Sequence, residues 1–477
     1  MRQGRSIFIS GGGPSGLAAA LLFHQLGWEE IVLAERRASP QDFEKNKAFN
    51  YQVNQLSQAL LRRLGINDRL ETFGVANQAF TATTVKADGT ANTQQLGIID
   101  PNRPINYWTT RRNLLTMLFE AVEERNDGRI KVLYSHAVRG VERPDNDGKC
   151  SVLVEGPGGE QRSFTPDLLL ACDGLSSVIR RSAQADRDVP DGYFDMIVHP
   201  SPSAQLKYKV LNLPPVFTAC GGDVPVDNHK LAYVFLSRHK DPRRACSLFA
   251  FPVANPEHPR SVNMIREQDH VLWTIEDAEE LLVFLEDAFP QLAIRDLVPR
   301  EEAEDYVRLE AGQFPEPQHA RNIHARLGDT ELLLVGDSAH AFPPDLGMGV
   351  NSALNDLEVL AQHLESGDAL PTALERYAKA QQPEIEALVR LVQTVFPEQY
   401  ATRKWALRRW MLGFAVRGAL NKIMPGLFDK HAFILGQDAT ISFTELERRK
   451  LRTDRRVKNV GIALAAAVAA GLLALFV

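Results

Sequence analysis

A glycine-rich turn near the start of the chain limits the possible fold more than any other feature. Residues 6–10, Ser-Ile-Phe-Ile-Ser, predict a β-strand before the turn, and the Ala- and Leu-rich segment 17–26 predicts a helix after it. Between them, Gly11, Gly13 and Gly16 fill the pattern G-x-G-x-x-G. The first glycine permits a tight turn, the second lets a pyrophosphate approach the backbone, and the third lets helix and strand pack closely. The pattern predicts a Rossmann-type α/β domain that binds a dinucleotide.

An acidic residue follows at the distance that this fold requires. Residues 30–34 predict a second buried strand, and Glu35 comes directly after it. A carboxylate about 20 residues beyond the glycines accepts hydrogen bonds from an adenosine ribose. Ser15 in the turn and Arg36 beside the acid are also predicted to contact the cofactor. A glycine-rich turn without a ligand is the alternative, and the joint presence of strand, helix and acid disfavours it.

Two later segments show the same build, an apolar strand that ends in Gly and Asp residues. Residues 167–171 lead into Cys172-Asp173-Gly174, and residues 332–335 lead into Gly336-Asp337. Ligands of open α/β sheets lie beyond the C-terminal ends of the parallel strands. An Asp at such an end is well placed to bind a polyol chain such as ribityl. NAD and FAD share the first fingerprint, and these two further segments favour FAD.

Taken together, these segments resemble the motifs of class A FAD-dependent monooxygenases, the aromatic hydroxylase group, and most closely those of kynurenine 3-monooxygenases. The likeness covers most of the chain, and its matching segments are Gly336–Ala341, Pro344, Gly347-Met348-Gly349, Asn351 and Ile423-Met424-Pro425. The resemblance implies an FAD-dependent, NAD(P)H-consuming monooxygenase. Such an enzyme inserts one oxygen atom from O2 into an aromatic or lipophilic substrate through a flavin C4a-hydroperoxide.

The resemblance also implies roles for single residues. Glu35 should hold the adenosine ribose, Arg111 should lie near the FAD phosphates, and Asp337 should bind ribityl. Asp173-Gly174 should serve the point where flavin and nicotinamide meet, and the backbone of Val350-Asn351 should face the isoalloxazine ring. The complete set of predicted cofactor contacts is Gly11, Gly13, Ser15, Gly16, Glu35, Arg36, Arg111, Asp173, Gly174, Asp337, Gly347, Gly349, Val350 and Asn351.

Two residues of the flavin-proximal segment are candidates for a catalytic role. Pro343 belongs to the stiff sequence Ala341-Phe342-Pro343-Pro344, which lies where the family packs a loop against the flavin. His340 could carry a proton near neutral pH, and it could also be a buried histidine with a structural role. No residue pattern indicates a metal site.

The residues that hold the amino-acid group of kynurenine in that family are not matched. The Arg position falls on Ala82 or a neighbouring Thr, and the first Tyr position falls on Ile105, with Tyr107 nearby. The Asn and second Tyr positions fall near Pro397 and Ala432. An unpaired substrate carboxylate in an apolar pocket would cost on the order of several kcal/mol. Kynurenine is therefore disfavoured as the substrate, and a reductase of isoprenoid double bonds and a kynurenine-type 3-hydroxylase are the alternative functions.

The chain is expected to fold into interleaved domains. An FAD-binding domain takes up 1–75, 103–189 and 320–375, and an antiparallel β-sheet substrate domain takes up 76–102 and 190–319. Residues 376–457 form a helical C-terminal region. Its Trp405 and Trp410 could cap the substrate cavity, rest on lipid headgroups or pack as core.

The last segment, 460–477, is apolar and uncharged, and basic residues dominate 448–458 before it. As a helix of about 27 Å it would just span a bilayer. This predicts one C-terminal transmembrane helix that anchors the enzyme with its catalytic domain in the cytosol, on the mitochondrial outer membrane or the ER. A buried C-terminal helix is the alternative.

Composition narrows the setting. The net charge of −6 argues against a nucleic-acid partner. The four cysteines form no C-x-x-C pair, which indicates a reducing compartment rather than a disulfide scaffold. The resemblance to aromatic hydroxylases implies a small aromatic or lipophilic substrate and O2 as partners, and the apolar C-terminal segment predicts the membrane as a further one.

Overall fold

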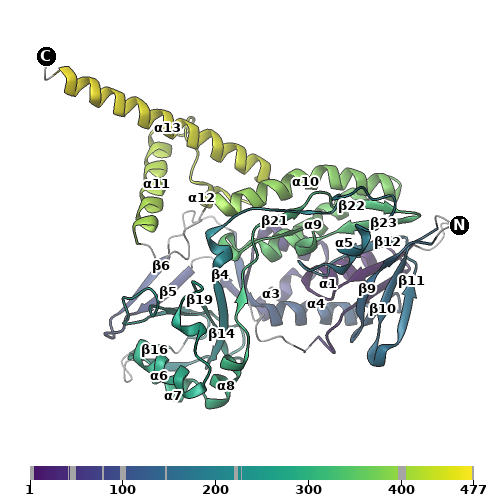
Figure 1. The fold of residues 1–477 in the computed structure, drawn as a ribbon, viewed down its shortest axis with the longest axis horizontal. Helices are drawn as coiled ribbons and strands as arrows, with labels where there is room; N and C mark the ends of the chain where they lie inside the picture. Colours follow the sequence, from purple (N-terminus) through teal and green to yellow (C-terminus); the bar gives the residue numbers. More distant parts are fainter. Residues whose placement is uncertain are drawn as a thin grey trace.

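A computed structural model describes residues 5–40, 42, 50–77, 80–96, 104–144, 148–219, 224–226, 228–395 and 404–474 of the chain. Two large β-sheets lie side by side in it, and three C-terminal helices extend beyond them (Figure 1). The α/β class predicted from the sequence is confirmed.

The first large sheet has six strands and forms the centre of the larger core. In order across the sheet they are β22 (His324–Leu327), β23 (Thr330–Leu334), β12 (Leu168–Ala171), β1 (Ser6–Ser10), β2 (Glu30–Ala34) and β8 (Ile130–Leu133). Neighbouring strands run parallel except for the antiparallel edge strand β22. Strands buried on both faces need continuous apolar runs, and the Leu-Leu-Leu-Ala sequence of β12 is buried throughout.

Helices cover this sheet, and three of them carry predicted cofactor contacts near their N-terminal ends, namely Ser15 and Gly16, Arg111, and Gly349 to Asn351. The covering helices are α1 (Pro14–Gln25), α2 (Gln55–Arg63), α4 (Arg111–Arg125), α5 (Val178–Ala183), α9 (Gly349–Leu364) and α10 (Leu370–Val395). Helix α1 packs against both α4 and α9, and α9 packs against α2 and α10. Pro14 stands in the first turn of α1, where its missing N–H leaves no helical hydrogen bond unmade.

The second large sheet has seven strands and its own apolar core. In order they are β20 (Gly312–Gln313), β14 (Lys207–Leu213), β19 (Arg260–Arg266), β18 (Ser247–Ala250), β17 (Ala232–Leu236), β5 (Phe80–Val85) and β6 (Ala91–Leu96). Beside it lie α6 (Ala278–Ala288), α7 (Ile294–Leu297) and α8 (Arg300–Arg308), low in Figure 1. The prediction of an antiparallel sheet needs a correction, because β17 and β5 pair in parallel. Alternating apolar residues indicate a strand but not the direction in which a distant segment joins it.

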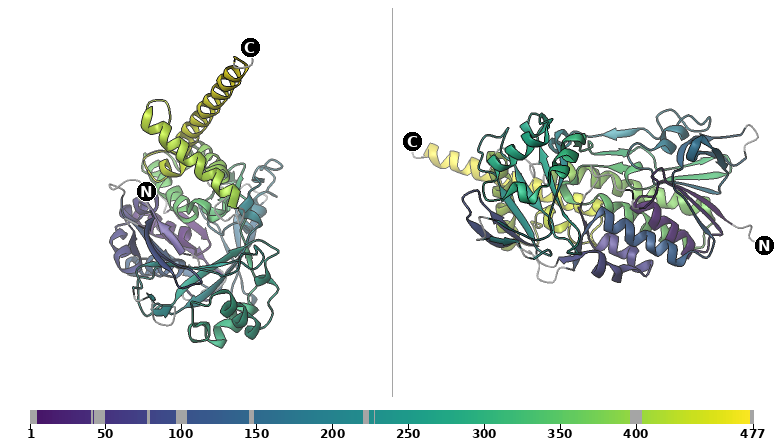
Figure 2. Two further views of the ribbon diagram at one scale, coloured as in Figure 1. Left: turned by 90° about the vertical axis from the view of Figure 1, so that its left-hand side faces the viewer. Right: turned by 90° about the horizontal axis from the view of Figure 1, so that it is seen from below.

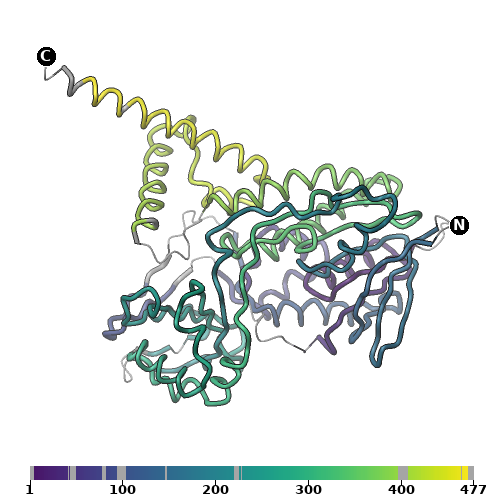
Figure 3. The backbone as a smooth tube through the Cα atoms, viewed as in Figure 1, coloured from purple at the N-terminus to yellow at the C-terminus, as the bar shows by residue number. Residues whose placement is uncertain are grey.

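Smaller, three-stranded sheets accompany the two large ones. One consists of β3 (Asn50–Val53), β7 (Asn106–Thr110) and β4 (Val75–Asn77), and another of β13 (Met196–Val198), β21 (Gln318–Ala320) and β24 (His340–Ala341). A third, of β9 (Ala137–Glu142), β10 (Ser151–Glu155) and β11 (Gln161–Phe164), lies toward the N-terminal end of the molecule. The tube in Figure 3 follows the chain as it leaves the six-stranded sheet for the seven-stranded one and returns.

The C-terminal part consists of α11 (Lys404–Ile423), α12 (Ala432–Leu435) and α13 (Phe443–Ala474). Helices α11 and α13 project from the rest of the molecule, and the chain ends far from its start (Figure 2). The predicted anchor, 460–477, falls on the end of α13 and on 475–477, which lie outside the described residues. Within the described residues, no helix has both the length and the apolar character to cross a membrane. The predicted anchor is therefore not supported; α13 is charged as far as Lys458, and only its end is apolar.

Candidate active site

The three glycine and aspartate segments follow three neighbouring strands of the six-stranded sheet. Ser10 of β1 pairs with Ala171 of β12, and Ala171 pairs with Leu334 of β23, so the three turns start level with one another. Gly11 has φ +99°, and a Cβ there would lie 2.5 Å from the carbonyl oxygen of Cys172. The turn after β1 therefore packs directly on the turn after β12, and only glycine allows this approach.

The third turn, which follows β23, packs against the start of α1. Gly336 has φ +64°, and a Cβ there would lie 3.0 Å from the Ser15 Oγ at the start of α1. A Cβ on Gly16 would fall onto the carbonyl oxygen of Gly11, so helix and strand touch at this position. The predicted contact residues of all three segments thus gather at the C-terminal edge of the parallel strands.

Open space borders four of the predicted contact glycines. A Cβ built on Gly13, Gly174, Gly347 or Gly349 would meet no other heavy atom within 4 Å. Gly13 immediately precedes α1, where the first N–H groups of a helix lack partners and attract anions. Bare backbone beside open space at a helix start fits the pyrophosphate of FAD.

Glu35 fixes the glycine turn. Its carboxylate accepts hydrogen bonds from the backbone N–H of Gly12 at 2.7 Å and of Arg37 at 2.9 Å. The Arg37 guanidinium pairs with this carboxylate and donates to the carbonyl of Gly12 at 2.9 Å. Burial alone would raise the pKa of Glu35, but the hydrogen bonds and charge of Arg37 lower it below its usual value. Arg36, the predicted contact, is exposed, whereas the buried Arg37 was missed because adjacent arginines give the same sequence signal.

Asp173 lies at the edge of the site, and its side chain caps the first turn of α5. One carboxylate oxygen accepts from the backbone N–H of Val178 at 2.7 Å and of Ile179 at 3.2 Å. The other oxygen, Oδ1, is buried and has no partner among the described residues. Burial raises the pKa of Asp173. The oxygen without a partner and the open space at Gly174 leave room for a donor group of a ligand.

Asp337, Arg111 and two tyrosines share a polar site across the junction of the sheets. The Asp337 side chain is exposed, yet desolvation by the surrounding protein raises its pKa, while His340 and Arg111 oppose the rise. Burial raises the pKa of Tyr51 to about 12; the hydrogen-bonded Arg111 opposes this, and Asp337 and Tyr208 add to it. Asp337 is thus accessible even though the surrounding protein desolvates it. The sequence indicated Asp337 and Arg111 but neither tyrosine.

His340 lies behind this polar site. Its Nε2 is 2.8 Å from Oδ2 of Asp356, and both side chains are 1% exposed. Asp356 also accepts from the backbone N–H of Gly336 at 3.0 Å and from Nε2 of Gln381 at 2.8 Å. Burial would lower the pKa of His340, but the charge and hydrogen bond of Asp356 raise it overall. The pair holds the turn that carries Asp337, which is a positioning role.

Asn351 ties the loop before α9 to the start of α2. Its side-chain oxygen accepts from the backbone N–H of Asn54 at 2.9 Å, and its amide donates to the carbonyls of Gln52 at 2.7 Å and Gly347 at 2.8 Å. Gly347 has φ +62°, which glycine adopts readily. Val350 is buried next to this cross-link. The loop is therefore held in one conformation before any ligand arrives.

Pro343 is buried at the start of the short turn Pro344–Leu346. Asp345 in this turn is 2% exposed, and no hydrogen bond of good geometry reaches either carboxylate oxygen from the described residues. Burial raises the pKa of Asp345 to about 7, with Ser203 opposing the rise. This carboxyl was not singled out by any sequence motif, since its unusual state comes from tertiary burial alone.

The fold and site define a flavin-binding protein of the monooxygenase class, with a dinucleotide sheet and a second sheet meeting at the site. The family model described as FAD binding domain matches residues 5–392, so the chain belongs to this family. FAD is its cofactor, and the chain is an FAD-dependent monooxygenase.

Several known proteins are similar to this chain over most of their length. The kynurenine 3-monooxygenase of Salinispora tropica is 23% identical, over 97% of this chain and 95% of that protein. The structure of tetrameric 2-methyl-3-hydroxypyridine-5-carboxylic acid oxygenase has a TM-score of 0.58 at 18% identity. The match covers 85% of this chain and 95% of the chain in that structure. Pseudomonas aeruginosa PqsL in complex with 2-aminobenzoylacetate has a TM-score of 0.56 at 16% identity, over 87% of this chain and 100% of its own. The two structures share the fold with this chain.

Proposed function

We propose that the protein uses NAD(P)H and O2 to insert one oxygen atom into a neutral aromatic or lipophilic substrate. Bound FAD supplies the redox chemistry, namely the acceptance of electrons from NAD(P)H and the activation of O2. The chain's own part is to bind the cofactor, to orient the substrate and to exclude water. The glycine turns, Glu35, Arg111 and Asp337 are the proposed cofactor contacts.

The proposal of a neutral substrate rests on two buried cations of the seven-stranded sheet, both of which are hydrogen-bonded to backbone carbonyls. Arg260 is fully buried, and its guanidinium donates to the backbone carbonyls of Pro215, Asn228, Leu231 and Phe251. The Nζ of the buried Lys209 donates to the carbonyls of Tyr306 and Val307. Both cations thus hold backbone in place, and neither is available to a substrate carboxylate.

The position of the missing arginine supports the same conclusion. Ala82 on β5 is 3% exposed, so a small apolar side chain is buried where kynurenine 3-monooxygenases are expected to carry Arg. Ile105 is 42% exposed and Pro397 lies outside the described residues. Binding a carboxylate without a cation in such surroundings is unfavourable.

Aromatic side chains at the junction of the sheets support an aromatic substrate. Trp108 of β7 and Phe251, which follows β18, contact each other with ring centroids 5.2 Å apart, and Phe249 lies 4.4 Å from Phe251. Tyr208 of β14 stacks on Phe314 at 5.0 Å. The named compounds of the similar proteins, a kynurenine, a hydroxypyridine carboxylic acid and 2-aminobenzoylacetate, are likewise aromatic.

The test is a measurement of O2 uptake during NADPH and NADH oxidation by the holoenzyme. The panel contains matched pairs of aromatic compounds, each with and without a carboxylate, and a set of isoprenoid alkenes. We expect O2 uptake coupled to a product that gains one oxygen atom, with higher kcat/KM for the neutral member of each pair. Preference for the acids would refute the neutral substrate, and anaerobic reduction of the alkenes would instead establish a reductase.

A further inference from the structure

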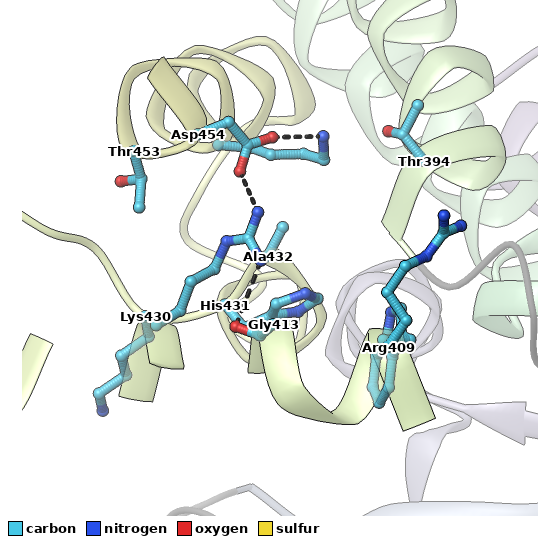
Figure 4. A pocket seen from close by; sticks show the side chains of 11 residues that line it. Thr394, Arg409, Gly413, Lys430, His431, Ala432, Thr453 and Asp454 are labelled. Atoms are coloured by element: carbon cyan, nitrogen blue, oxygen red, sulfur yellow. Dashed lines mark hydrogen bonds and ion pairs between the residues drawn. The ribbon is translucent and has the colours of Figure 1, made fainter. Parts of the chain in front are cut away.

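A separate cavity lies among the C-terminal helices. It has a volume of about 200 Å³ and is bounded by the end of α10, by α11, by α12 and by α13 (Figure 4). All lining residues fall between Thr394 and Asp454. None of them belongs to the three flavin segments, so the cavity is separate from the candidate active site.

The lining of the cavity has a large excess of positive charge. Its cations are Arg409, Arg417, Lys430 and Lys450, and Asp454 is the single carboxylate. Asp454 accepts hydrogen bonds from Arg417 Nη2 at 2.6 Å and from Lys450 Nζ at 2.9 Å, and both contacts meet at this residue in Figure 4. One carboxylate thus serves two cations. Arg409 and Lys430 are exposed, and no carboxylate of the described residues lies within ion-pair distance of either; the Arg409 guanidinium lies 5.1 Å from the centroid of the Trp405 ring. The net charge of the lining is positive, so the cavity attracts anions.

A buried neutral donor adds to this charge. His431 is 8% exposed, and its Nδ1 accepts from the backbone N–H of Phe433 at 3.2 Å. Burial lowers the pKa of His431 to about 4, with Arg417 lowering it further, so the ring is neutral at physiological pH. A neutral ring that accepts at Nδ1 carries its proton on Nε2. This N–H lines the cavity without an acceptor among the described residues, which a bound ligand oxygen would supply.

The wall beside His431 is fixed by packing. Trp410 donates from Nε1 to the carbonyl of Val395 at 2.9 Å and presents its ring edge-on to His431 at 5.3 Å. Phe414 stacks on Trp410 at 5.4 Å. The site therefore exists before a ligand binds, which reduces the entropy lost on binding.

We propose that this cavity binds the phosphate group of an anionic ligand. A phosphate carries close to two negative charges and three strong acceptor oxygens, and the planar guanidinium of Arg417 matches such oxygens. A ligand that carries one carboxylate in place of the phosphate would neutralise less of the positive charge of the lining. The volume also admits an organic group attached to the phosphate. Soluble phosphate esters and phospholipid headgroups share this chemistry.

Calorimetric titration of the FAD-loaded protein with inorganic phosphate, at low ionic strength in a phosphate-free buffer, tests the proposal. Bound FAD occupies the pyrophosphate site and removes it as a competitor. We expect one saturable site, weakened about tenfold or more by the double change Arg409→Gln and Lys430→Gln, because two positive charges beside the cavity are lost. Asp454→Asn should tighten binding by removing the competing carboxylate.

Arg408→Gln is the matched control. Arg408 is an exposed cation of α11 outside the lining, and its loss should change the phosphate affinity by no more than about twofold. Equal weakening by the control and the double variant would show a diffuse surface charge and would overturn the site. Absence of saturable phosphate binding would overturn it as well.

Two further titrations identify the source of the phosphate. Glycerol 3-phosphate represents soluble esters, and phosphatidylcholine vesicles with phosphatidic acid represent lipids. Variant-sensitive binding of the first assigns a soluble ligand, and variant-sensitive binding of the vesicles alone assigns a headgroup. If neither binds in a manner sensitive to the double change, the proposal is wrong.

Discussion

At the scale of single residues, Asp345 makes folding depend on pH. Burial raises the pKa of Asp345 from 3.8 to about 7. Between these values the folded protein holds a proton that the unfolded chain has released, so stability falls as pH rises from about 4 to about 7 and then levels off. Asp345→Asn removes this loss. We expect the variant to match the wild type near pH 4 and to exceed its free energy of unfolding by about 2–4 kcal/mol at pH 8.

Urea unfolding at a series of pH values checks this prediction. Asp296→Asn, an exposed position at the start of α7, is the control and should change stability by no more than about 0.5 kcal/mol at any pH. A gain for Asp345→Asn that stays constant across the pH series would show that the carboxyl is already ionised at pH 4, contrary to its burial.

Adjacent arginines at 36 and 37 allow a second test at this scale. Arg37 is buried and hydrogen-bonds both Glu35 and the Gly12 carbonyl, whereas Arg36 is exposed. Removing one partner of a buried pair costs about 3–5 kcal/mol. Arg37→Gln should therefore destabilise the apoprotein and weaken FAD binding about tenfold or more, and Arg36→Gln should change the stability by less than about 0.5 kcal/mol. Thermal unfolding and FAD fluorescence titration measure the two effects, and comparable losses in both variants would contradict the assignment.

At the scale of elements, two substitutions in the glycine turn are expected to have different effects, one on folding and the other on FAD binding. A Cβ at Gly11 would collide with the Cys172 carbonyl in a left-handed backbone, whereas a Cβ at Gly13 meets open space in an extended one. We expect Gly11→Ala to lower the unfolding temperature of the apoprotein strongly. Gly13→Ala should leave the apoprotein unchanged and weaken FAD at least about tenfold, because the added methyl occupies the pyrophosphate position. Unchanged FAD affinity in Gly13→Ala would place the pyrophosphate elsewhere.

The elements that the sequence specifies are those whose signals are local. The predicted strands at 6–10 and 30–34 coincide with β1 and β2, because short apolar runs next to turns have few other solutions. The helix expected over 17–26 begins earlier, at Pro14, since proline suits the first helical turn. The sequence predicts the glycines and aspartates of the candidate site because a turn or a strand end requires them. Tyr51, Tyr208 and Asp356 join the site through tertiary contacts, which no single segment of sequence encodes.

At the scale of the whole molecule, the candidate active site connects the two large sheets. Tyr51 precedes α2 beside the six-stranded sheet, and Tyr208 is the second residue of β14 in the other sheet, yet Tyr208 contributes to the raised pKa of Tyr51. Ser203, just before β14, opposes the pKa rise of Asp345 in the loop before α9. Trp108, in the small sheet of β3, β7 and β4, contacts Phe251 beside the seven-stranded sheet through their rings. We expect a cofactor bound here to contact residues of both sheets, whereas the cavity between α11 and α13 shares no residue with either.

This separation predicts two independent patterns of hydrogen exchange. FAD should slow amide exchange in the β1–α1 turn, in the loop before α9 and at the start of β14, because ligand binding suppresses the opening of the segments it joins. FAD at 100 times its Kd should also stabilise the folded state by about 2.7 kcal/mol. Phosphate added to the FAD-loaded protein should slow exchange only around α12 and the facing turns of α11 and α13. Exchange mass spectrometry measures both patterns in one protein; a change in the C-terminal helices on FAD binding would show that the two sites are coupled.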